Sequence, residues 1–215
     1  MTTATTTTFP TAGTALEGDL VLPAGAHGVV VFAHGSGSTR HSPRNRSVAA
    51  ELNKRALGTL LVDLLTREEE VRDARARDLR FDIGLLADRL IGLVDWLGRQ
   101  SLTRSLPVGL FGASTGAAAA LVAAAARTAE VHAVVARGGR PDLAGTALPR
   151  VEAPTLLIVG ERDLPIVELN EQARNTMTVE AELRIVPGAT HLFEEPGTLG
   201  VVAEEAGTWF AAHLR

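Results

Sequence analysis

The pentapeptide GASTG, residues 112–116, holds Ser114 between two glycines. It follows the apolar run PVGLF and precedes the segment AAAALVAAAA, whose composition is typical of a helix. Gly-x-Ser-x-Gly between a strand and a helix is the pattern of a serine nucleophile on a sharp turn, where the glycines let both elements approach closely. The pattern leaves one structural alternative open, a glycine-rich turn whose serine caps the helix.

A serine hydroxyl is a weak nucleophile, so it needs a base, and the base needs an acid that orients it. Asp163 follows the apolar run LLIVG, and His191 follows the run RIVPG further along the chain. Both lie where parallel strands are expected to end, and the order serine, acid, histidine suits a serine hydrolase of the α/β class. Each has a structural alternative, since Asp163 could cap the next helix and His191 could be an ordinary loop residue. Glu161 is a rival acid, but Asp163 is better placed after the glycine turn.

When a serine attacks a carbonyl group, the carbonyl oxygen becomes an oxyanion, and two backbone N–H groups are expected to bind it. One is that of Thr115, directly after the nucleophile, and the other comes from the loop FAHGSGSTRHSP. Ser36 is the favoured second donor by position, and Gly37 is the next candidate and a candidate substrate contact. His34 is expected to anchor this loop rather than to act as a second base.

Three arginines lie near the predicted site. Arg44 and Arg46 fall in the first turn of a helix, where the helix dipole disfavours cations. Arg44, together with Arg137 at the end of another predicted strand, could bind an anionic group of the substrate. The alternative, which we favour for the first-turn arginines, is ion pairing with acidic neighbours.

Strand and helix patterns alternate along the chain, which predicts a mostly parallel sheet of eight strands, with an antiparallel N-terminal hairpin and helices on both faces. Thr66–Asp78 mixes charges of both signs and is expected to be a solvated loop or the start of a helix. The sequence predicts strands over 16–23, 28–35, 58–65, 107–112, 131–139, 153–160 and 181–188, and helices over 42–57, 76–100, 115–127, 168–176 and 197–214.

The composition is that of an ordinary globular protein. The 215 residues suit a single domain, 1–215, in which the threonine-rich residues 1–12 are expected to be flexible. A net charge of −4 gives no reason to expect a nucleic-acid partner. The absence of cysteine excludes a thiolate nucleophile, and the histidines show no spacing for a metal site.

No segment suggests targeting to a membrane. The N-terminus lacks the basic and apolar regions of a secretory signal, and no apolar run approaches the roughly 20 residues that span a bilayer. We therefore expect a cytoplasmic protein with no membrane partner.

Taken together, these motifs resemble the α/β-hydrolase superfamily, and more narrowly its dienelactone hydrolase-like group, over nearly the whole chain. The resemblance implies the α/β-hydrolase fold, a serine nucleophile, no cofactor, no metal, and hydrolysis of small-molecule esters or lactones. Related domains are sometimes fused to phosphoribosyltransferases. The segments that carry the resemblance are VVVFAHGSGSTRHSPRN, GLFGASTG, RGGRPDLAG, LLIVGERD and VPGATHLFEEPG.

The chain departs from the group in two ways. Dienelactone hydrolases proper carry a cysteine nucleophile, whereas this chain has none, so a serine esterase is the better description. The chain also has no long insertion between VVARGG and Asp163, where many lipases carry a lid, which indicates an open site for small or accessible substrates. Two alternatives remain: an acyltransferase, or a ligand-binding or partner-binding protein with an idle triad.

Overall fold

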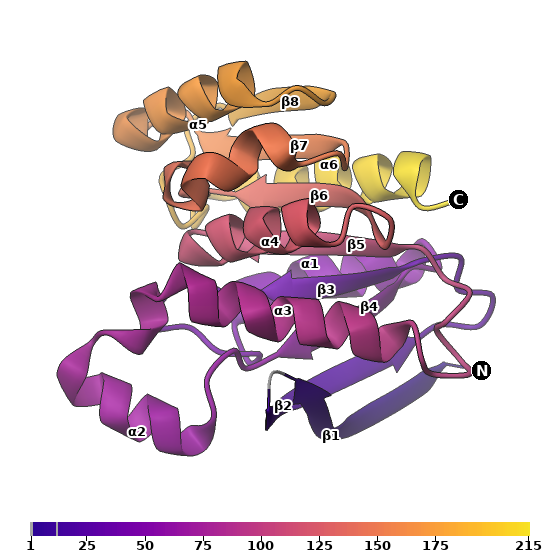
Figure 1. Ribbon diagram of the computed structural model, residues 1–215. Coiled ribbons are helices and arrows are strands. Elements are labelled where there is room, and N and C mark those ends of the chain that lie inside the picture. The colour runs from indigo at the N-terminus through magenta and orange to yellow at the C-terminus, as the bar shows by residue number, and fades with distance from the viewer. Residues whose placement is uncertain (1, 12) are drawn as a thin grey trace.

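The computed structural model describes residues 2–11 and 13–215, and residues 1 and 12 lie outside the description. The described residues form eight strands and six α-helices around one sheet (Figure 1). The strands are β1 Thr3–Thr11, β2 Thr14–Leu22, β3 Val29–Ala33, β4 Gly58–Val62, β5 Val108–Ala113, β6 Val131–Arg137, β7 Thr155–Gly160 and β8 Ala181–Val186. The helices are α1 Pro43–Lys54, α2 Arg67–Ala76, α3 Ile83–Leu97, α4 Thr115–Ala126, α5 Leu164–Thr176 and α6 Thr198–His213, with 3-10 turns η1 Leu79–Phe81 and η2 Pro141–Arg150.

The sheet has the order β1-β2-β4-β3-β5-β6-β7-β8, which confirms the predicted mostly parallel arrangement. Strand β2 runs antiparallel to both of its neighbours, and β3 to β8 are all parallel to one another. Because parallel strands end at one edge of the sheet, the segments after β3, β5, β7 and β8 meet at that edge. This is the edge where ligands bind in open parallel sheets.

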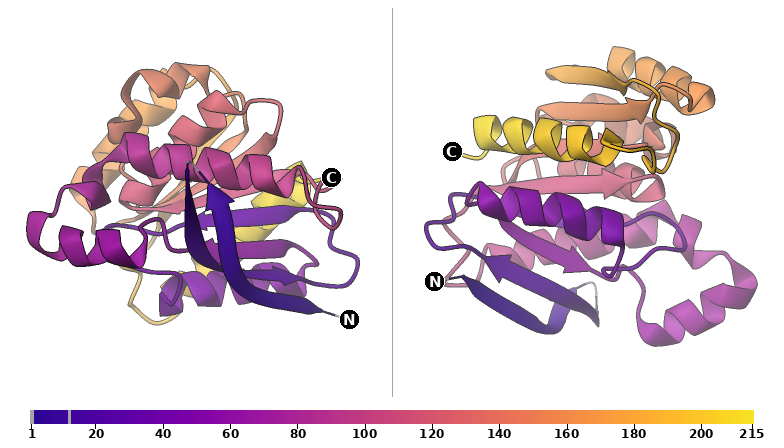
Figure 2. Two further views of the ribbon diagram at one scale, coloured as in Figure 1. Left: turned by 60° about the horizontal axis from the view of Figure 1, so that its bottom comes forward. Right: turned by 180° about the vertical axis from the view of Figure 1, so that it is seen from behind.

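Helices cover both faces of the sheet, as predicted. Helices α3, α4 and α5 lie on one face, and α1 and α6 lie on the other, as the front and back views show (Figures 1 and 2). Successive strand residues point to opposite faces, so Val134 packs in the cluster under α3 and α4, whereas Val135 packs in the cluster under α1 and α6. Buried on both sides, these strands read as continuous apolar runs.

Apart from shifts of a few residues in element bounds, such as the start of α5 at Leu164 instead of 168, the structure differs from the sequence prediction at three places. Residues 3–11, within the threonine-rich segment that the sequence leaves as flexible, pair along their whole length with β2. The helix predicted over 76–100 begins only at Ile83, because the Asp82 carboxylate accepts a hydrogen bond from Leu85 N–H and caps it there. The η2 turn of residues 141–150 has no counterpart in the prediction, and the connection from β6 to β7 forms no large lid.

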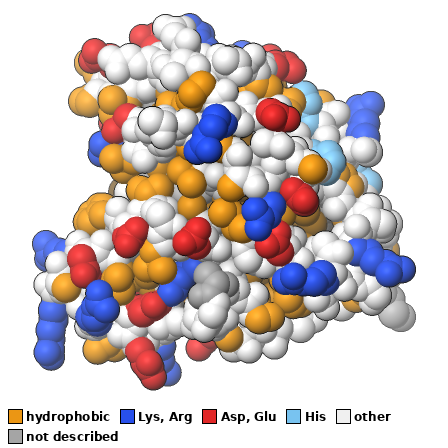
Figure 3. Space-filling view, viewed as in Figure 1, with side chains coloured by type: hydrophobic (Ala, Val, Ile, Leu, Met, Phe, Trp, Pro, Cys, Tyr) orange, Lys and Arg blue, Asp and Glu red, His pale blue; other side chains and the backbone are white. Residues whose placement is uncertain are grey.

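The charge-mixed segment after β4 forms helix α2, which stands out from the body of the molecule (Figure 1). Thr66 and Glu69 form a capping box at its start, and Arg89 of α3 holds Glu69 with two hydrogen bonds of 2.7 and 2.6 Å. Acidic and basic side chains are interspersed over this part of the surface (Figure 3). Within the part of the chain described, no helix combines the length and hydrophobicity needed to cross a bilayer.

Two glycines set how closely helix α4 approaches the sheet. A Cβ at Gly112 would collide with the backbone of Ala117 in α4, and a Cβ at Gly116 would collide with the carbonyl oxygens of Ala33 and His34. Backbone atoms on rigid elements cannot yield to an added methyl group as a flexible side chain can. The first turn of α4 is therefore pressed against β3 and β5.

Replacing Gly112 by alanine should lower the stability, because the collision is with backbone on both sides. We expect a loss of about 1–3 kcal/mol, which lowers Tm by several degrees, measured by thermal unfolding. Gly200→Ala is the matched control, since nothing lies within 4 Å of its added Cβ in the exposed face of α6. That variant should be as stable as the wild type or more so. An unchanged Tm for Gly112→Ala would contradict the close approach described here.

Candidate active site

Ser114 occupies the sharp turn between β5 and α4. Its backbone angles, φ 51° and ψ −121°, lie in a region that residues with a side chain seldom adopt. Although Ser114 stands at the N-cap position of α4, its side chain makes no capping hydrogen bond. The capping alternative that the sequence leaves open is therefore not what this hydroxyl does, and the half-buried side chain is free for chemistry at the edge of the sheet.

Asp163 and His191 meet across the ends of β7 and β8. The Asp163 Oδ2 atom lies 2.6 Å from His191 Nδ1, with the carboxylate 15% and the imidazole 38% exposed. Asp163 also stands at an N-cap position, that of α5, and makes no capping hydrogen bond there. A carboxylate on Nδ1 holds the proton on that nitrogen and leaves Nε2 unprotonated, as a general base requires.

The loop that carries His191, residues 187–197, is held by two other glutamates. Glu161, the rival acid from the sequence, accepts a hydrogen bond from Gly188 N–H at 2.8 Å. Glu195 accepts from both the N–H and the hydroxyl of Thr190, at 3.1 and 2.7 Å. These hydrogen bonds, first of all that of the Thr190 hydroxyl, lower the pKa of Glu195. Glu161 is thus a brace of the loop, and Asp163 alone of the two acids contacts the imidazole.

Strand β6 brings the histidine loop and the serine turn to the same place. The Ser114 N–H donates to the carbonyl oxygen of Arg137, the last residue of β6, at 3.2 Å. The next residue, Gly138, has φ 51°, and a Cβ on it would lie 3.4 Å from His191 Nδ1. Arg137, at the end of β6, and Gly138, directly after it, therefore abut Ser114 and His191, so the three predicted catalytic residues share one edge of the sheet.

The predicted oxyanion donors lie beside Ser114 but are not equivalent. Thr115 is the first residue of α4, where backbone N–H groups have no partner within the helix. The N–H of Ser36, in the β3–α1 loop (residues 34–42), donates to the Thr115 hydroxyl at 2.9 Å. In this structure the second predicted donor is thus engaged by a side chain. Gly37, with φ 73°, follows in the same loop.

His34 anchors the β3–α1 loop, as its position in the sequence predicts. Its Nε2 accepts a hydrogen bond from Leu64 N–H at 3.1 Å, and its Nδ1 lies 3.0 Å from the carbonyl oxygen of Gly35. An acceptor role for Nε2 assigns the proton to Nδ1. Burial lowers the pKa of His34, although the Gly35 carbonyl and Asp63 oppose this shift. His34 is accordingly a neutral structural residue at neutral pH.

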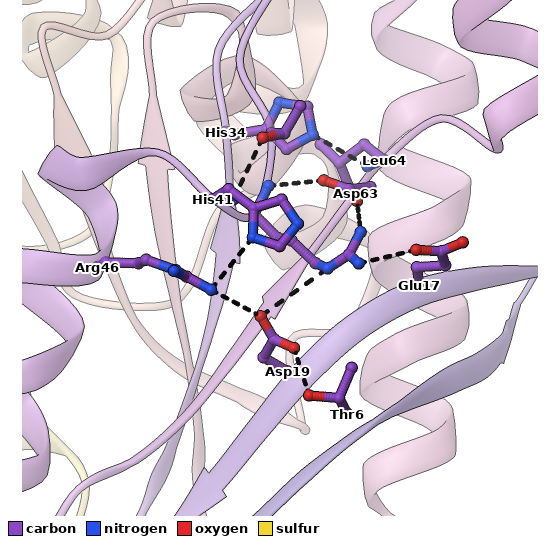
Figure 4. Close-up of polar contacts among 10 residues, drawn as sticks. Thr6, Glu17, Asp19, His34, His41, Arg46, Asp63 and Leu64 are labelled. Atoms are coloured by element: carbon purple, nitrogen blue, oxygen red, sulfur yellow. Dashed lines mark hydrogen bonds and ion pairs between the residues drawn. The ribbon is translucent and has the colours of Figure 1, made fainter.

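An ion cluster around Arg40 holds the other end of this loop. The Arg40 guanidinium contacts Asp63, Glu17 at 2.8 Å and Asp19 at 3.8 Å, and the Arg40 N–H also donates to Asp63 Oδ1 at 2.6 Å. Figure 4 shows these three carboxylates converging from β2 and from the end of β4. Arg46 joins the cluster through Asp19 at 3.5 Å. The loop is therefore fixed from behind by charges on neighbouring strands.

The two candidate substrate arginines lie near enough to each other for the charge of Arg44 to act on Arg137. Arg44 pairs with Glu194 at 3.2 Å, so the ion-pair alternative holds for it as for Arg46. Arg137 is 7% exposed, and its guanidinium carbon lies 5.9 Å from the centroid of the Phe193 ring. No described residue accepts a hydrogen bond from its Nε or Nη1. Burial, and secondly the charge of Arg44, lower the pKa of Arg137 to about 10, so it stays protonated at neutral pH.

A cavity of about 220 Å³ lies against the β3–α1 loop. Residues 34–39 form one wall, and Leu65, Leu86 and Arg80 contribute to the others. The position of a Cβ on Gly37 would lie 3.8 Å from Arg80 Nη1, which places this guanidinium beside the loop. Among the described residues, no group of three or more histidine or acidic side chains could hold a metal ion.

Sequence reasoning missed three features of this site. The Thr115 hydroxyl, the Arg40 cluster and Arg80 all contact segments far apart from them in the chain; Ser36 and Thr115, for example, are 79 positions apart. The acids of the Arg40 cluster lie within predicted strands, where charged residues are uncommon. These positions could have indicated an ion cluster from the sequence. Nothing in the local sequence distinguishes Thr115 from a threonine that only begins a helix.

Comparison with known proteins places the chain in a large group of hydrolase-like folds. Residues 26–213 match the model of the family described as alpha/beta hydrolase domain. The crystal structure of a dienelactone hydrolase from Anabaena variabilis is similar over 100% of this chain and 99% of its own, with 56% identity and a TM-score of 0.98. Est1E from Butyrivibrio proteoclasticus is similar over 96% of this chain and 98% of its own, with a TM-score of 0.80; at 14% identity this likeness concerns the fold alone.

Curated relatives carry a different kind of name. A protein of Mycobacterium tuberculosis named "Putative phosphoribosyl transferase" is 59% identical over 199 residues, which are 93% of this chain and 44% of that protein. The same match holds for the protein of a second strain of that species. The chain therefore spans less than half the length of the curated relatives it matches.

The buried neutral state of His34 predicts a specific loss of stability in acid. Between its lowered pKa and the ordinary value of 6.5, the unfolded chain binds more protons at this residue than the folded protein does. The free energy of unfolding should therefore fall as the pH falls through this range. His34→Gln, whose amide oxygen can accept the Leu64 N–H but cannot titrate, should lose less stability between about pH 7.5 and about pH 5 in urea unfolding. Equal losses in the two proteins would contradict the assignment.

Proposed function

The chain belongs to the alpha/beta hydrolase domain family, and from this premise we propose that it is a serine hydrolase that cleaves small carboxylic esters or lactones. One observation carries the proposal: a serine at positive φ on the turn between β5 and α4 shares its edge of the sheet with a histidine whose Nδ1 is held by a carboxylate at 2.6 Å. The alternatives are an acyltransferase that uses the same residues and a binding protein with an idle triad.

The reaction follows from the roles of three side chains. His191 Nε2 takes the proton of the Ser114 hydroxyl as Ser114 Oγ attacks the ester carbonyl. Asp163 keeps the imidazole oriented and stabilises its charged form. The tetrahedral intermediate collapses when His191 gives its proton to the leaving alkoxide, which leaves an acyl-enzyme on Ser114. Water, activated by the same imidazole, then releases the acid and restores the serine.

The negative charge of the intermediate is expected to develop at the start of α4. The Thr115 N–H points out of the first turn of this helix, where the helix dipole also favours an anion. The close approach of α4 to β3 and β5 fixes the Thr115 N–H before the substrate binds. Donors that need no rearrangement are the ones that lower a barrier most effectively.

Two further observations support small esters or lactones as substrates. The cavity of about 220 Å³ is lined by Ser36 and Gly37, the candidate oxyanion and substrate contacts of the β3–α1 loop, and is of a size for a short acyl or alcohol group. The connection between β6 and β7 adds only the η2 turn over this edge of the sheet. The name of the Anabaena variabilis relative, dienelactone hydrolase, supports lactones as members of the substrate class.

Arg137 supports an anionic group on the substrate. A buried guanidinium without a carboxylate partner is costly, and a ligand carboxylate would supply the missing acceptor. Arg44 lies near enough to affect the pKa of Arg137, and its own partner, Glu194, is largely exposed. The subsite would lie beside Ser114, whose N–H bonds to the Arg137 carbonyl oxygen.

The proposed nucleophile is tested by comparing wild type with Ser114→Ala on p-nitrophenyl esters from acetate to octanoate. The wild type should turn over the shorter esters, and the variant should fall to background, because it lacks the hydroxyl that would form the acyl-enzyme. Asp163→Asn should retain the fold but lose about 10⁴-fold in kcat, since the imidazole then takes the wrong tautomer. Full activity of Ser114→Ala would rule out this nucleophile, and products formed only with an added acceptor alcohol would identify an acyltransferase.

The anionic subsite is tested with a matched pair of substrates, mono-p-nitrophenyl succinate and p-nitrophenyl butyrate. Arg137→Met should lower kcat/KM for the succinate by about 10–100-fold more than for the butyrate, as expected for the loss of a charge-assisted hydrogen bond. Arg46→Met is the control, because Arg46 lies in the same helical turn as Arg44 but pairs with Asp19. Equal losses on both substrates would remove the subsite.

A further inference from the structure

We propose that the side-chain hydroxyl of Thr115 is itself an oxyanion donor, with the Ser36 N–H acting on the oxyanion through this hydroxyl rather than directly. The inference rests on the proposed hydrolase function and adds a residue to its machinery. In this arrangement one residue, directly after the nucleophile, supplies two donors: its backbone N–H and its O–H.

The Ser36 N–H, which the sequence predicts as a direct oxyanion donor, donates to the Thr115 hydroxyl instead. The nitrogen of this N–H, in the β3–α1 loop, lies 2.9 Å from Thr115 Oγ1. Thr115 is 4% exposed, and its β-branched side chain has few rotamers available at the start of a helix. The hydroxyl is therefore held beside the nucleophile, in the direction from which the second donor was expected.

The hydrogen of the Thr115 hydroxyl has no acceptor among the described residues. A hydroxyl has one donor and two acceptor positions, and the bond from Ser36 uses an acceptor position. No residue in the described part of the chain accepts the Thr115 O–H. The Thr115 N–H likewise has no acceptor there, as the first N–H of α4. Two donors on Thr115, the residue directly after the candidate nucleophile, thus lack acceptors among the described residues.

Other buried threonines of this chain show that the free hydrogen is unusual. Four of them donate their hydroxyl to a backbone carbonyl oxygen: Thr11 at 2.6 Å, Thr103 at 2.7 Å, Thr155 at 2.9 Å and Thr198 at 2.8 Å. Thr59, which accepts a bond from the Asn53 amide, is the second residue of β4 and lies at the opposite edge of the sheet. Thr115 alone combines an accepting bond with a place beside the candidate nucleophile.

The hydrogen bond from the Ser36 N–H strengthens the Thr115 O–H as a donor. A hydroxyl that accepts a hydrogen bond becomes a stronger donor, because the chain of bonds polarises it. The Ser36 N–H and the N-terminus of α4 both act in this sense on the Thr115 O–H. The loop that presents Ser36 is itself fixed by His34 and Arg40, so the donor chain is in place before the substrate binds.

The test compares Thr115→Val, which removes the hydroxyl and keeps the shape and the N–H, with Thr115→Ser, which keeps both donors. In p-nitrophenyl ester hydrolysis, the valine variant should lose about 10²-fold or more in kcat with little change in KM, as for the loss of one oxyanion donor. The serine variant should stay within about tenfold of the wild type. Thermal unfolding reports the fold of each variant. If valine prevents folding, Thr115→Ala replaces it, since alanine is well tolerated in a helix.

A thionoester separates a direct donor from a brace of the loop. Sulfur accepts hydrogen bonds weakly, so the donor matters less when the reacting oxygen is replaced by sulfur. The fold-loss caused by Thr115→Val should therefore be clearly smaller for the thionoester than for the matched oxygen ester. A residue that only positions the loop would cause the same loss on both substrates, which would overturn the inference.

The remaining outcomes also decide between the proposals. A valine variant as fast as the wild type, or faster, would overturn the role of the hydroxyl and leave the serine hydrolase in place. Faster turnover would mean that the hydroxyl blocks the Ser36 N–H and must be displaced by the substrate. A wild type that hydrolyses neither substrate would overturn the proposed function and, with it, this inference.

Discussion

The packing of α4 against β3 and β5 is the constraint on which the rest of the site depends. Because a Cβ at Gly112 or Gly116 would meet backbone atoms, only glycine permits this contact. The contact compresses the turn between strand and helix, and Ser114 takes the positive φ that the compressed turn requires. The same packing brings the first N–H and hydroxyl of α4 to the β3–α1 loop, where Ser36 meets Thr115.

Around this fixed turn, the remaining groups are held from behind by polar contacts outside the site. His34 and the Arg40 cluster brace one loop, while Glu161 and Glu195 brace the loop of His191. These braces bond mainly to backbone N–H groups or to opposite charges, so none of them occupies the side chains of Ser114, Asp163 or His191. Among the described residues, Arg137 is a buried cation without a hydrogen-bond acceptor for its Nε or Nη1, and its carbonyl oxygen accepts the N–H of the candidate nucleophile, Ser114.

Local pattern in the sequence predicts the parallel part of the sheet and places Ser114, Asp163 and His191 at strand ends, whereas it leaves β1 as a flexible segment. Apolar runs mark the strands, and Ser114, Asp163 and His191 each follow such a run. The sequence does not predict contacts between residues that are far apart in the chain. The hydroxyl of Thr115 gains its partner only when two strand ends meet, and the start of α3 is decided by the Asp82 cap rather than by hydrophobic periodicity.

The most direct test of the account is covalent labelling of the wild-type protein with a fluorophosphonate, read by intact mass and by peptide mapping. A nucleophilic serine with an oriented imidazole and a formed oxyanion site reacts with this reagent, whatever its natural substrate is. The account predicts one adduct per chain, on Ser114, and little labelling of His191→Ala. An unlabelled protein, or an adduct on another residue, would contradict the assignment of Ser114 as the nucleophile.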